Sequence, residues 1–384
     1  MHMKRAFLLI YILATFSADA QDVAFARKMV DTLASRQFWG RGYTDDGLKK
    51  AAAFLSSQFS SYGLKPMDGK SYFQSFSHPV NTFPGKMDVV VNGESLVPGK
   101  DFIVSPESRG ARSRGTLERI DSVQYMNPKE RVVIKLEDKL TWSVASGVED
   151  YTVIQVAKAA LEDAPQSFRV QIENKFVPDF KAANVCGVVK GTAKPDSLIL
   201  ITAHYDHLGG MGSDTYFPGA NDNASGVSLL LNLARYYAKN PQRYSIGFIL
   251  FAGEEAGLVG SKYFTENPLL PLKNIRFLLN TDLAGTGEDG ITVVNATEFP
   301  KEFAALQAIN KEQSLLNAVN ARGKAANSDH YFFTEKGVPA FFFYTLGGIK
   351  AYHDIFDRPE TLPLTEHEDL FKLVVSFTSY LTGK

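Results

Sequence analysis

Apolar residues in the second half of the chain form short unbroken runs that alternate with segments of helical spacing. The runs at residues 198–203 and 340–344 contain β-branched or aromatic residues without helical periodicity, which is typical of buried strands. Residues 227–237 place apolar side chains three and four positions apart, as an amphipathic helix does. Strands that alternate with helices predict an α/β fold with a mixed, mostly parallel central β-sheet and helices on both faces.

The same patterns predict the other elements of this main domain. Further strands are expected at residues 72–76, 185–189, 245–251, 275–281 and 291–295. Further helices are expected at residues 23–33, 47–62, 258–264, 300–313 and 366–381. Gly63 directly follows one of these helices and Pro66 comes shortly after it, which is a common signature of a helix end.

The sequence between residues 85 and 183 has a different pattern. Short β-like runs at residues 87–91, 102–104, 132–136, 151–156 and 168–172 are separated by Gly, Pro and charged turns. We expect this stretch to be a smaller β-rich lobe inserted between residues 21–84 and residues 184–384, which together form the main domain. A decorated extension of the main domain is the alternative interpretation.

The first residues have the features of a secretory signal peptide. Lys4 and Arg5 precede an apolar run at residues 6–16, and the small-x-small sequence Ala18-Asp19-Ala20 follows. The apolar run is too short for a comfortable transmembrane span. We therefore expect residues 1–20 to be removed by cleavage near Ala20. The protein would then be exported to a bacterial periplasm or the medium, with no integral membrane span in the mature chain.

Composition adds little about partners. The chain has 384 residues, and 41 Lys and Arg residues stand against 42 Asp and Glu residues, giving a net charge of −1. This balance provides no electrostatic argument for binding nucleic acid, and we expect none. The single cysteine, Cys186, cannot form a disulfide within the chain. Oligomeric state is left open.

Polar side chains follow the apolar strands at the points where these strands end. Because the carboxyl ends of parallel strands meet at one edge of a sheet, such residues are expected to lie together. Each of them alone is more often a turn, a helix cap or a surface residue. Five separate segments with this property at one edge are hard to obtain by chance. They supply His204 and Asp206, Asp222, Glu254 and Glu255, Asp282, and Tyr352 with His353.

The types of side chain indicate a metal. Imidazoles and carboxylates without a thiolate suit zinc best, with cobalt or manganese as substitutes. Three carboxylate segments and two histidines are more than one tetrahedral ion needs. Two ions that share a bridging carboxylate, as in two-metal hydrolytic sites, would use all of them.

The motifs and their order resemble those of the M28 family of zinc aminopeptidases. The resemblance covers residues 184–384 and, more loosely, residues 38–76. It implies a zinc-aminopeptidase-like fold and a metallo-exopeptidase that removes N-terminal residues from peptides. The lobe at residues 85–183 takes the place of a protease-associated-type lobe in relatives, although its signature is absent. The matching motifs are His204-x-Asp206, Gly219-Ala220-Asn221-Asp222-Asn223-Ala224-Ser225-Gly226, Glu254-Glu255-x-Gly257-Leu258-x-Gly260-Ser261, Asn280-x-Asp282 and Tyr352-His353.

The resemblance also implies a role for each ligand. One zinc ion would be held by His204 and Asp282, and the other by Glu255 and His353, with Asp222 bridging the two. Relatives carry a cis peptide just after the bridging aspartate, which here is the bond between Asp222 and Asn223.

Other residues would act on the reaction rather than hold the metal. Glu254 would be the general base, taking a proton from the metal-bridging water and returning it to the leaving amine. Asp206 would orient the imidazole of His204, and Tyr352 would donate a hydrogen bond to the developing oxyanion. The element Ser328-Asp329-His330 would support the site or shape the substrate pocket. Of the other histidines, His78, His207 and His367 are interpreted as surface or structural residues.

Three alternatives accompany this interpretation. A glutaminyl cyclase shares the fold but uses one zinc ion, and a dipeptidase or carboxypeptidase could use the same scaffold. A non-catalytic binding module is the alternative from another class. The segments that follow Asp222 and the Glu254-Glu255 pair match the peptidase form rather than the cyclase. The side chain preferred at the cleaved end does not follow from these motifs.

Overall fold

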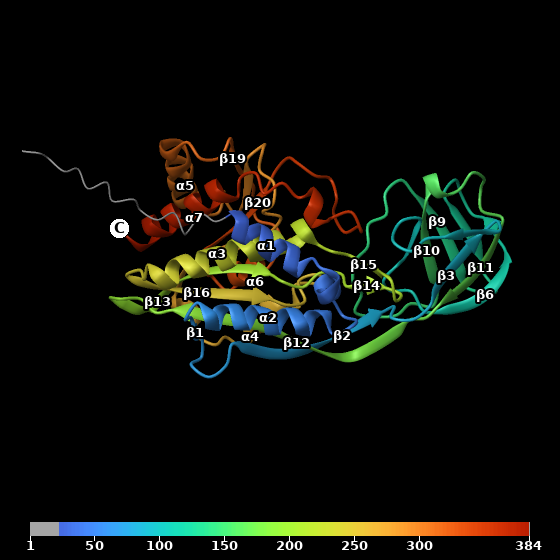
Figure 1. Cartoon of the computed structure of the whole chain (residues 1–384), viewed down its shortest axis with the longest axis horizontal. Helices are drawn as coiled ribbons and strands as arrows, with labels where there is room; N and C mark the ends of the chain where they lie inside the picture. The colour runs from blue at the N-terminus through green and yellow to red at the C-terminus, as the bar shows by residue number, and fades with distance from the viewer. Residues whose placement is uncertain (1–22, 384) are drawn as a thin grey trace, which may run out of the picture.

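The computed structural model describes residues 23–383, so the predicted signal peptide lies outside the described residues. Within this range, a nine-stranded mixed sheet forms the centre of the larger body, in the order β1-β12-β16-β13-β17-β20-β18-β19 with β2 paired to β12 (Figure 1). These strands are β1 (Lys65–Pro66), β2 (Phe73–Thr82), β12 (Lys175–Val189), β13 (Lys194–His204), β16 (Tyr244–Phe251), β17 (Ile275–Thr281), β18 (Ile291–Val294), β19 (Val319–Ala321) and β20 (Ala340–Thr345).

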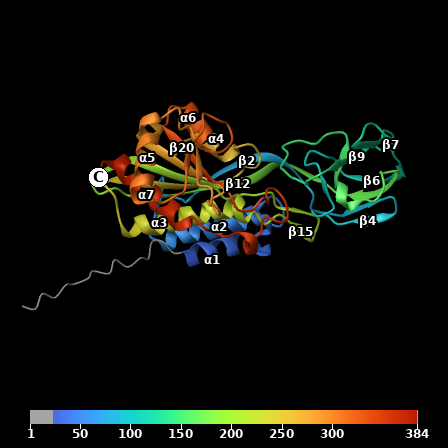
Figure 2. The same cartoon turned by 90° about the horizontal axis from the view of Figure 1, so that it is seen from above.

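The four central strands, β16, β13, β17 and β20, are parallel, and antiparallel pairs flank them. Their side chains alternate between two hydrophobic clusters. Ile199 and Ile201 of β13 belong to one cluster, whereas Leu200 belongs to the other. Helices cover both faces, and Figure 2 shows the sheet between these two layers. The predicted mixed α/β fold is thereby confirmed.

The helices divide between the two faces according to the cluster they pack on. One layer contains α1 (Val23–Leu33), α2 (Gly47–Ser61), α3 (Gly226–Lys239), α5 (Pro300–Gln313) and α7 (His367–Thr382), and the other contains α4 (Val259–Glu266) and α6 (His330–Glu335).

Several elements begin and end where the sequence pattern places them, one differs clearly, and the short elements β1, β19 and α6 were not predicted. The helix at 23–33, the strand at 275–281 and the helix at 300–313 agree residue for residue. The strand expected at 185–189 is instead the end of β12, which pairs with β2 from Lys175 to Val185. β12 therefore runs through the predicted boundary at residue 183. An antiparallel ribbon with few apolar residues gives a weak pattern, so the sequence shows only its buried end.

The lobe is formed by two further sheets, at the right of Figure 1, which enclose a hydrophobic cluster of their own. This cluster also includes three residues of the main domain, Leu208, Met211 and Phe217. The lobe boundaries at residues 85 and 183 remain a prediction. One sheet contains β5 (Phe102–Val104), β10 (Thr152–Ala157), β9 (Val132–Glu137), β8 (Gln124–Asn127) and β7 (Glu118–Arg119), and the other contains β4 (Glu94–Leu96), β3 (Met87–Val91), β11 (Ser167–Ile172) and β6 (Ala111–Thr116).

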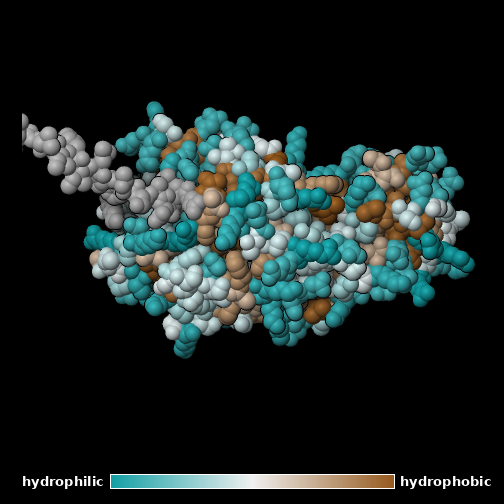
Figure 3. Space-filling model, viewed as in Figure 1, coloured by the Kyte–Doolittle hydropathy of each residue, from teal (hydrophilic) through white to brown (hydrophobic). Residues whose placement is uncertain are grey.

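Hydrophilic residues cover most of the face shown in Figure 3, with hydrophobic residues scattered among them. Between residues 23 and 383, no helix combines the length and the apolar character needed to cross a membrane.

Beneath this surface, His367 at the start of α7 is fully buried, and its Nε2 lies 3.4 Å from Nδ2 of Asn232 on α3. Burial lowers the pKa of the His367 imidazole to about 4, because the charged ring would lose its hydration. The ring is therefore neutral in the folded protein at neutral pH. The same ring in an unfolded chain has a pKa of about 6.5.

This difference predicts a pH-dependent loss of stability. Between pH 6.5 and 4 the unfolded chain binds a proton that the folded chain does not, so stability falls as the pH falls. We expect His367→Gln to remove about 2.5 kcal/mol of the decrease in unfolding free energy between pH 7.5 and 4.5. Urea unfolding of both proteins at the two pH values measures it, and an unchanged decrease in the variant would contradict the assignment.

Candidate metal centre

Three parallel strands deliver four of the predicted residues to one edge of the sheet. His204 is the last residue of β13, Asp282 directly follows β17, and Glu254 and Glu255 follow the end of β16. β13 pairs in parallel with both neighbours, so the three carboxyl ends meet at the same edge. Tertiary structure adds Asp222 and His353 to the same place, as their contacts below show.

Asp222 lies between two histidines. Its Oδ1 is 3.4 Å from Nε2 of His204, and its Oδ2 is 3.1 Å from Nε2 of His353. The first imidazole also lies 3.2 Å from Oδ2 of Asp282, and the second lies 3.1 Å from Oε2 of Glu255. The structure thus brings together all five predicted ligands in two imidazole–carboxylate sets that share Asp222.

The donor atoms have the spacing that a divalent metal needs. Ligand atoms around a tetrahedral zinc ion lie about 3.3 to 3.6 Å from one another, close to the contacts observed here. Nε2 of His204 is buried without a hydrogen-bond partner among the described residues. Donor atoms within 4.8 Å of one another form two groups, His204 with Asp222 and Glu255, and His204 with Glu254 and Asp282. The residues therefore fit a metal centre, with Glu254 beside it.

Charges crowded together in a buried site shift the protonation of this centre. Burial raises the pKa of Glu254 well above its usual value, with Glu255 adding to the shift and His204 opposing it. Burial would also raise the pKa of Glu255, but His353 and the hydrogen bond to His207 hold it well below its usual value. Burial would lower the pKa of His353, yet Glu255 and Asp222 raise it to about 11. The pKa of each of these groups thus depends on the charge of its neighbours, and such strongly shifted pKa values are typical of functional sites.

The loop that carries Asp222 is held by its backbone. The peptide between Asp222 and Asn223 is cis, as the resemblance implies. The carboxylate of Asp357 accepts the N–H groups of Asn221 and Asp222 at 2.8 and 3.0 Å. Gly219 has φ +57°, and a Cβ there would lie 2.2 Å from the carbonyl oxygen of Asp222, so only glycine fits.

Arg41 also holds the loop that carries Asp222. No motif in the sequence predicted this role. Its side chain is fully buried, which lowers the pKa of the guanidinium to about 10. All five of its N–H donors reach main-chain carbonyls. The acceptors are the carbonyl oxygens of Tyr205, Leu33, Pro218, Gly219 and Asp222, at 2.8, 3.0, 2.8, 2.8 and 3.2 Å.

Asp206 supports the centre in two ways. Nδ1 of His204 lies 3.2 Å from the main-chain oxygen of Asp206, whereas the carboxylate is 3.8 Å away. The carboxylate instead accepts the N–H groups of Glu254 and Glu255 at 3.1 and 3.3 Å, and the hydroxyl of Tyr43 at 3.0 Å. The side chain therefore fixes the turn that carries the two glutamates, and its carbonyl orients the imidazole.

The other predicted residues lie around the centre rather than in it. The ring of Tyr352 stacks on that of His353 at 4.0 Å, and 43% of Tyr352 is exposed. Ser328 accepts a hydrogen bond from Asn280 at 2.8 Å. Burial raises the pKa of Asp329 to about 7. The ring of His330, at the start of α6, packs on Phe342 at 5.2 Å.

His207, interpreted from the sequence as a surface or structural residue, contacts a predicted ligand that the sequence did not connect with it. It is fully buried, and its Nδ1 lies 2.7 Å from Oε1 of Glu255 and 4.0 Å from Oδ1 of Asp222. The available signal was its position directly after Asp206, in the same strand-end segment. His78 and His367 are also buried rather than on the surface, and they lie outside the contacts of the centre.

Comparison with known families decides the relationship. The model of "Peptidase family M28" matches residues 184–378, which is just over half of the chain and includes every predicted metal ligand. The chain belongs to peptidase family M28. Relatives within the curated proteins include aminopeptidase YwaD of Bacillus subtilis, 26% identical over 250 residues, covering 62% of this chain and 54% of that protein. A probable zinc metalloprotease of Pyricularia oryzae is 38% identical over 114 residues, covering 29% and 23%.

Solved structures share the whole M28 fold described above. BSAP, a zinc aminopeptidase from Bacillus subtilis, has a TM-score of 0.71 at 18% identity, covering 94% of this chain and 95% of that one. A peptidase M28 precursor from Shewanella amazonensis has a TM-score of 0.69 at 16% identity, covering 95% and 94%. The matches with curated relatives are shorter, since the chain spans 54% of the YwaD protein and 23% of the Pyricularia protein.

The five hydrogen bonds of Arg41 lead to a prediction about this M28 chain. Arg41→Met would leave buried carbonyls without donors, so we expect the free energy of unfolding to fall by about 3 kcal/mol or more. Arg36→Met is the matched control, because the contacts of Arg36 with Ser213, Asp214 and the Trp39 ring are made by an exposed side chain and should cost about 1 kcal/mol or less. Urea unfolding of the two variants compares these costs, and equal losses would show that Arg41 is not an anchor.

Proposed function

We propose that this protein is a zinc-dependent exopeptidase with two metal ions that removes N-terminal residues from peptides. The observation that carries the proposal is the position of Asp222 between His204 and His353, with Asp282 beside the first imidazole and Glu255 beside the second. This arrangement supplies two separate ligand sets that share one carboxylate, which suits two ions better than one.

These contacts support a role for each ligand. His204 and Asp282 would hold one zinc ion, Glu255 and His353 the other, and Asp222 would bridge them. Cobalt or manganese would be substitutes, because the set lacks thiolates. When bound, zinc would polarise the scissile carbonyl and lower the pKa of a water molecule to near neutrality.

Glu254 is proposed as the general base. It lies with His204 and Asp282 in one donor group, yet it is not needed to complete the two sets around Asp222. Its carboxylate would accept a proton from the attacking water and return it to the leaving amine. Asp206 supports this role, because it accepts hydrogen bonds from the main-chain N–H groups of both Glu254 and Glu255 and so fixes the backbone of the turn that carries them.

Tyr352 is proposed to donate a hydrogen bond to the oxyanion that forms at the scissile carbonyl. Burial beside four carboxylates raises the pKa of its phenol above the usual value, so the hydroxyl keeps its proton for donation. The partly exposed ring, stacked on His353, lies where a substrate can reach it.

The similarity to aminopeptidase YwaD favours removal of N-terminal residues over the dipeptidase and carboxypeptidase alternatives. A single-zinc glutaminyl cyclase would leave one of the two imidazole–carboxylate sets without a purpose. A binding module would not need Glu254 beside the ligands.

Hydrolysis of a substrate panel tests the proposal. The panel contains aminoacyl chromogenic amides, N-blocked peptides, substrates for release at the C-terminus and an N-terminal glutaminyl peptide. Each is assayed before chelation, after it, and after zinc is restored. We expect cleavage that needs a free amino terminus and returns with about two zinc equivalents. Cyclisation of the glutaminyl peptide alone would assign the cyclase, and bound zinc without any turnover would contradict the proposal.

Glu254→Gln separates proton transfer from metal binding. The amide keeps the size of the carboxylate but cannot accept the proton, so we expect turnover to fall by about 100-fold or more while zinc content is unchanged. Asp282→Asn is the matched comparison, because it changes a proposed ligand and should lower zinc content. Metal analysis beside steady-state kinetics measures both, and equal loss of zinc in the two variants would show that Glu254 is a ligand.

A further inference from the structure

The segment between β9 and β10 extends from the lobe to the metal centre. β9 and β10 are parallel neighbours, so the chain must cross over between them. Residues 138–151 make this crossing without regular structure, yet Leu140 and Trp142 are buried at 7% and 5% exposure. A connecting segment with buried apolar side chains is fixed in place by its packing.

Trp142 and His353 form two reciprocal hydrogen bonds. The main-chain N–H of Trp142 donates to the carbonyl of His353 at 2.9 Å, and Nδ1 of His353 lies 2.9 Å from the carbonyl oxygen of Trp142. A carbonyl oxygen can only accept, so Nδ1 carries the proton and donates. The other nitrogen, Nε2, is thereby aimed at Asp222 and Glu255, each 3.1 Å away.

Lobe and main domain together hold Trp142 in this position. Its indole N–H donates to the carbonyl of Val104 on β5 at 2.8 Å. Its ring stacks at 4.6 Å on Phe217, in the segment between His207 and Asp222. The tryptophan is therefore packed between the lobe sheet and a loop that leads to two residues of the centre.

Lys139 adds a second link from the same segment. Its Nζ donates to the carbonyls of Lys350 and Tyr352 at 3.0 and 3.4 Å, and lies 3.3 Å from the carboxylate of Asp354. His353 itself has φ +53°, a conformation that residues other than glycine rarely adopt. Contacts on both sides of His353 therefore hold a backbone that would not keep this conformation by itself.

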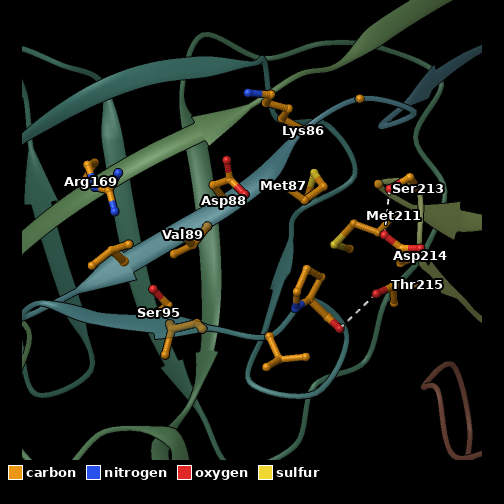
Figure 4. A pocket seen from close by; sticks show the side chains of 16 residues that line it. Lys86, Met87, Asp88, Val89, Ser95, Arg169, Met211, Ser213, Asp214 and Thr215 are labelled. Atoms are coloured by element: carbon orange, nitrogen blue, oxygen red, sulfur yellow. Dashed lines mark hydrogen bonds between the residues drawn. The ribbon is translucent and has the colours of Figure 1, made fainter.

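Elsewhere, a cavity rather than packed side chains lies between the lobe and the main domain. A cavity of about 530 Å³ separates β3 and β4 of the lobe from the hairpin of β14 (Gly210–Met211) and β15 (Thr215–Tyr216). Figure 4 shows Met87 and Asp88 on one side of it and Met211, Asp214 and Thr215 on the other. None of its lining residues is a proposed ligand. Trp142 therefore contacts a proposed ligand at this junction, whereas the residues that line the cavity include none.

We propose that the lobe completes the metal centre, with Trp142 as a positioning residue that orients His353 through its main-chain carbonyl. This inference rests on the proposed two-metal function. Loss of the contact should weaken the ion held by Glu255 and His353 and leave the ion at His204 and Asp282 in place. Loss of an orienting partner of a ligand histidine typically lowers metal affinity by about 10- to 100-fold.

Zinc binding by the full chain tests the proposal, with equilibrium dialysis and metal analysis as the measurement. We expect Trp142→Ala to keep one tight site and to weaken the second by about 10- to 100-fold. Lys139→Met leaves the packing of Trp142 intact and should weaken the same site by a smaller factor. Asp222→Ala should weaken both sites, which distinguishes a shared ligand from a positioning residue.

Two controls separate positioning from general damage to the lobe. Val170→Ala creates a cavity in the lobe cluster, where Val170 is 2% exposed, without touching His353. Thr141→Ala changes an exposed neighbour of Trp142. Both should keep two tight sites. Equal weakening in Val170→Ala and Trp142→Ala, or two tight sites in Trp142→Ala, would overturn the proposal.

A measurement on the metal-free protein distinguishes failure of this inference from failure of the proposed function. The Nδ1 proton of His353 should exchange slowly with solvent by NMR, and faster in Trp142→Ala, with His353→Gln as the assignment control. A wild-type chain that binds fewer than two zinc ions would overturn the two-metal function. Unchanged exchange in Trp142→Ala would overturn the positioning role, whatever the zinc content.

Discussion

Buried negative charges at one edge of the sheet form the constraint on which the rest of the structure depends. Asp222, Glu255 and Asp282 meet there with Glu254 beside them, and carboxylates out of water repel one another strongly. Such a group is stable only where positive charge and hydrogen-bond donors are brought to it. His204, His207 and His353 are the titratable donors in contact with these carboxylates, and the same arrangement suits divalent cations.

Main-chain hydrogen bonds give this cluster its fixed shape. Asp206 accepts hydrogen bonds from the N–H groups of the two glutamates, Asp357 accepts them from the N–H groups of Asn221 and Asp222, and Arg41 donates to five main-chain carbonyls. Each of these side chains is buried, and each joins segments that are far apart in the sequence. The ligands are therefore held by loops whose backbone groups are satisfied, which is the condition for a preorganised site.

The lobe takes part in the same scheme. Its crossing segment supplies a carbonyl to His353 in the way that Asp206 supplies one to His204. Its hydrophobic cluster includes Leu208, Met211 and Phe217, which stand between His207 and Asp222 in the sequence. The boundary drawn from the sequence pattern separates two stretches of chain, whereas the packing joins them at the point where the chemistry is proposed to occur.

The sequence by itself determined the order of the longer strands and helices of the main domain, the confirmed α/β fold and the residues that end the central strands. These features depend on local periodicity and on the rule that parallel strands share their carboxyl edge, so they can be predicted from neighbouring residues. Ligand roles for these residues remain predictions. Only the tertiary structure decided that His207 contacts Glu255, that Arg41 anchors the Asp222 loop and that Trp142 contacts His353. The contacts of Arg41 and of His353 each join a side chain to a main-chain carbonyl far away in the sequence. Every residue has such a carbonyl, so no sequence pattern marks which one will be bound.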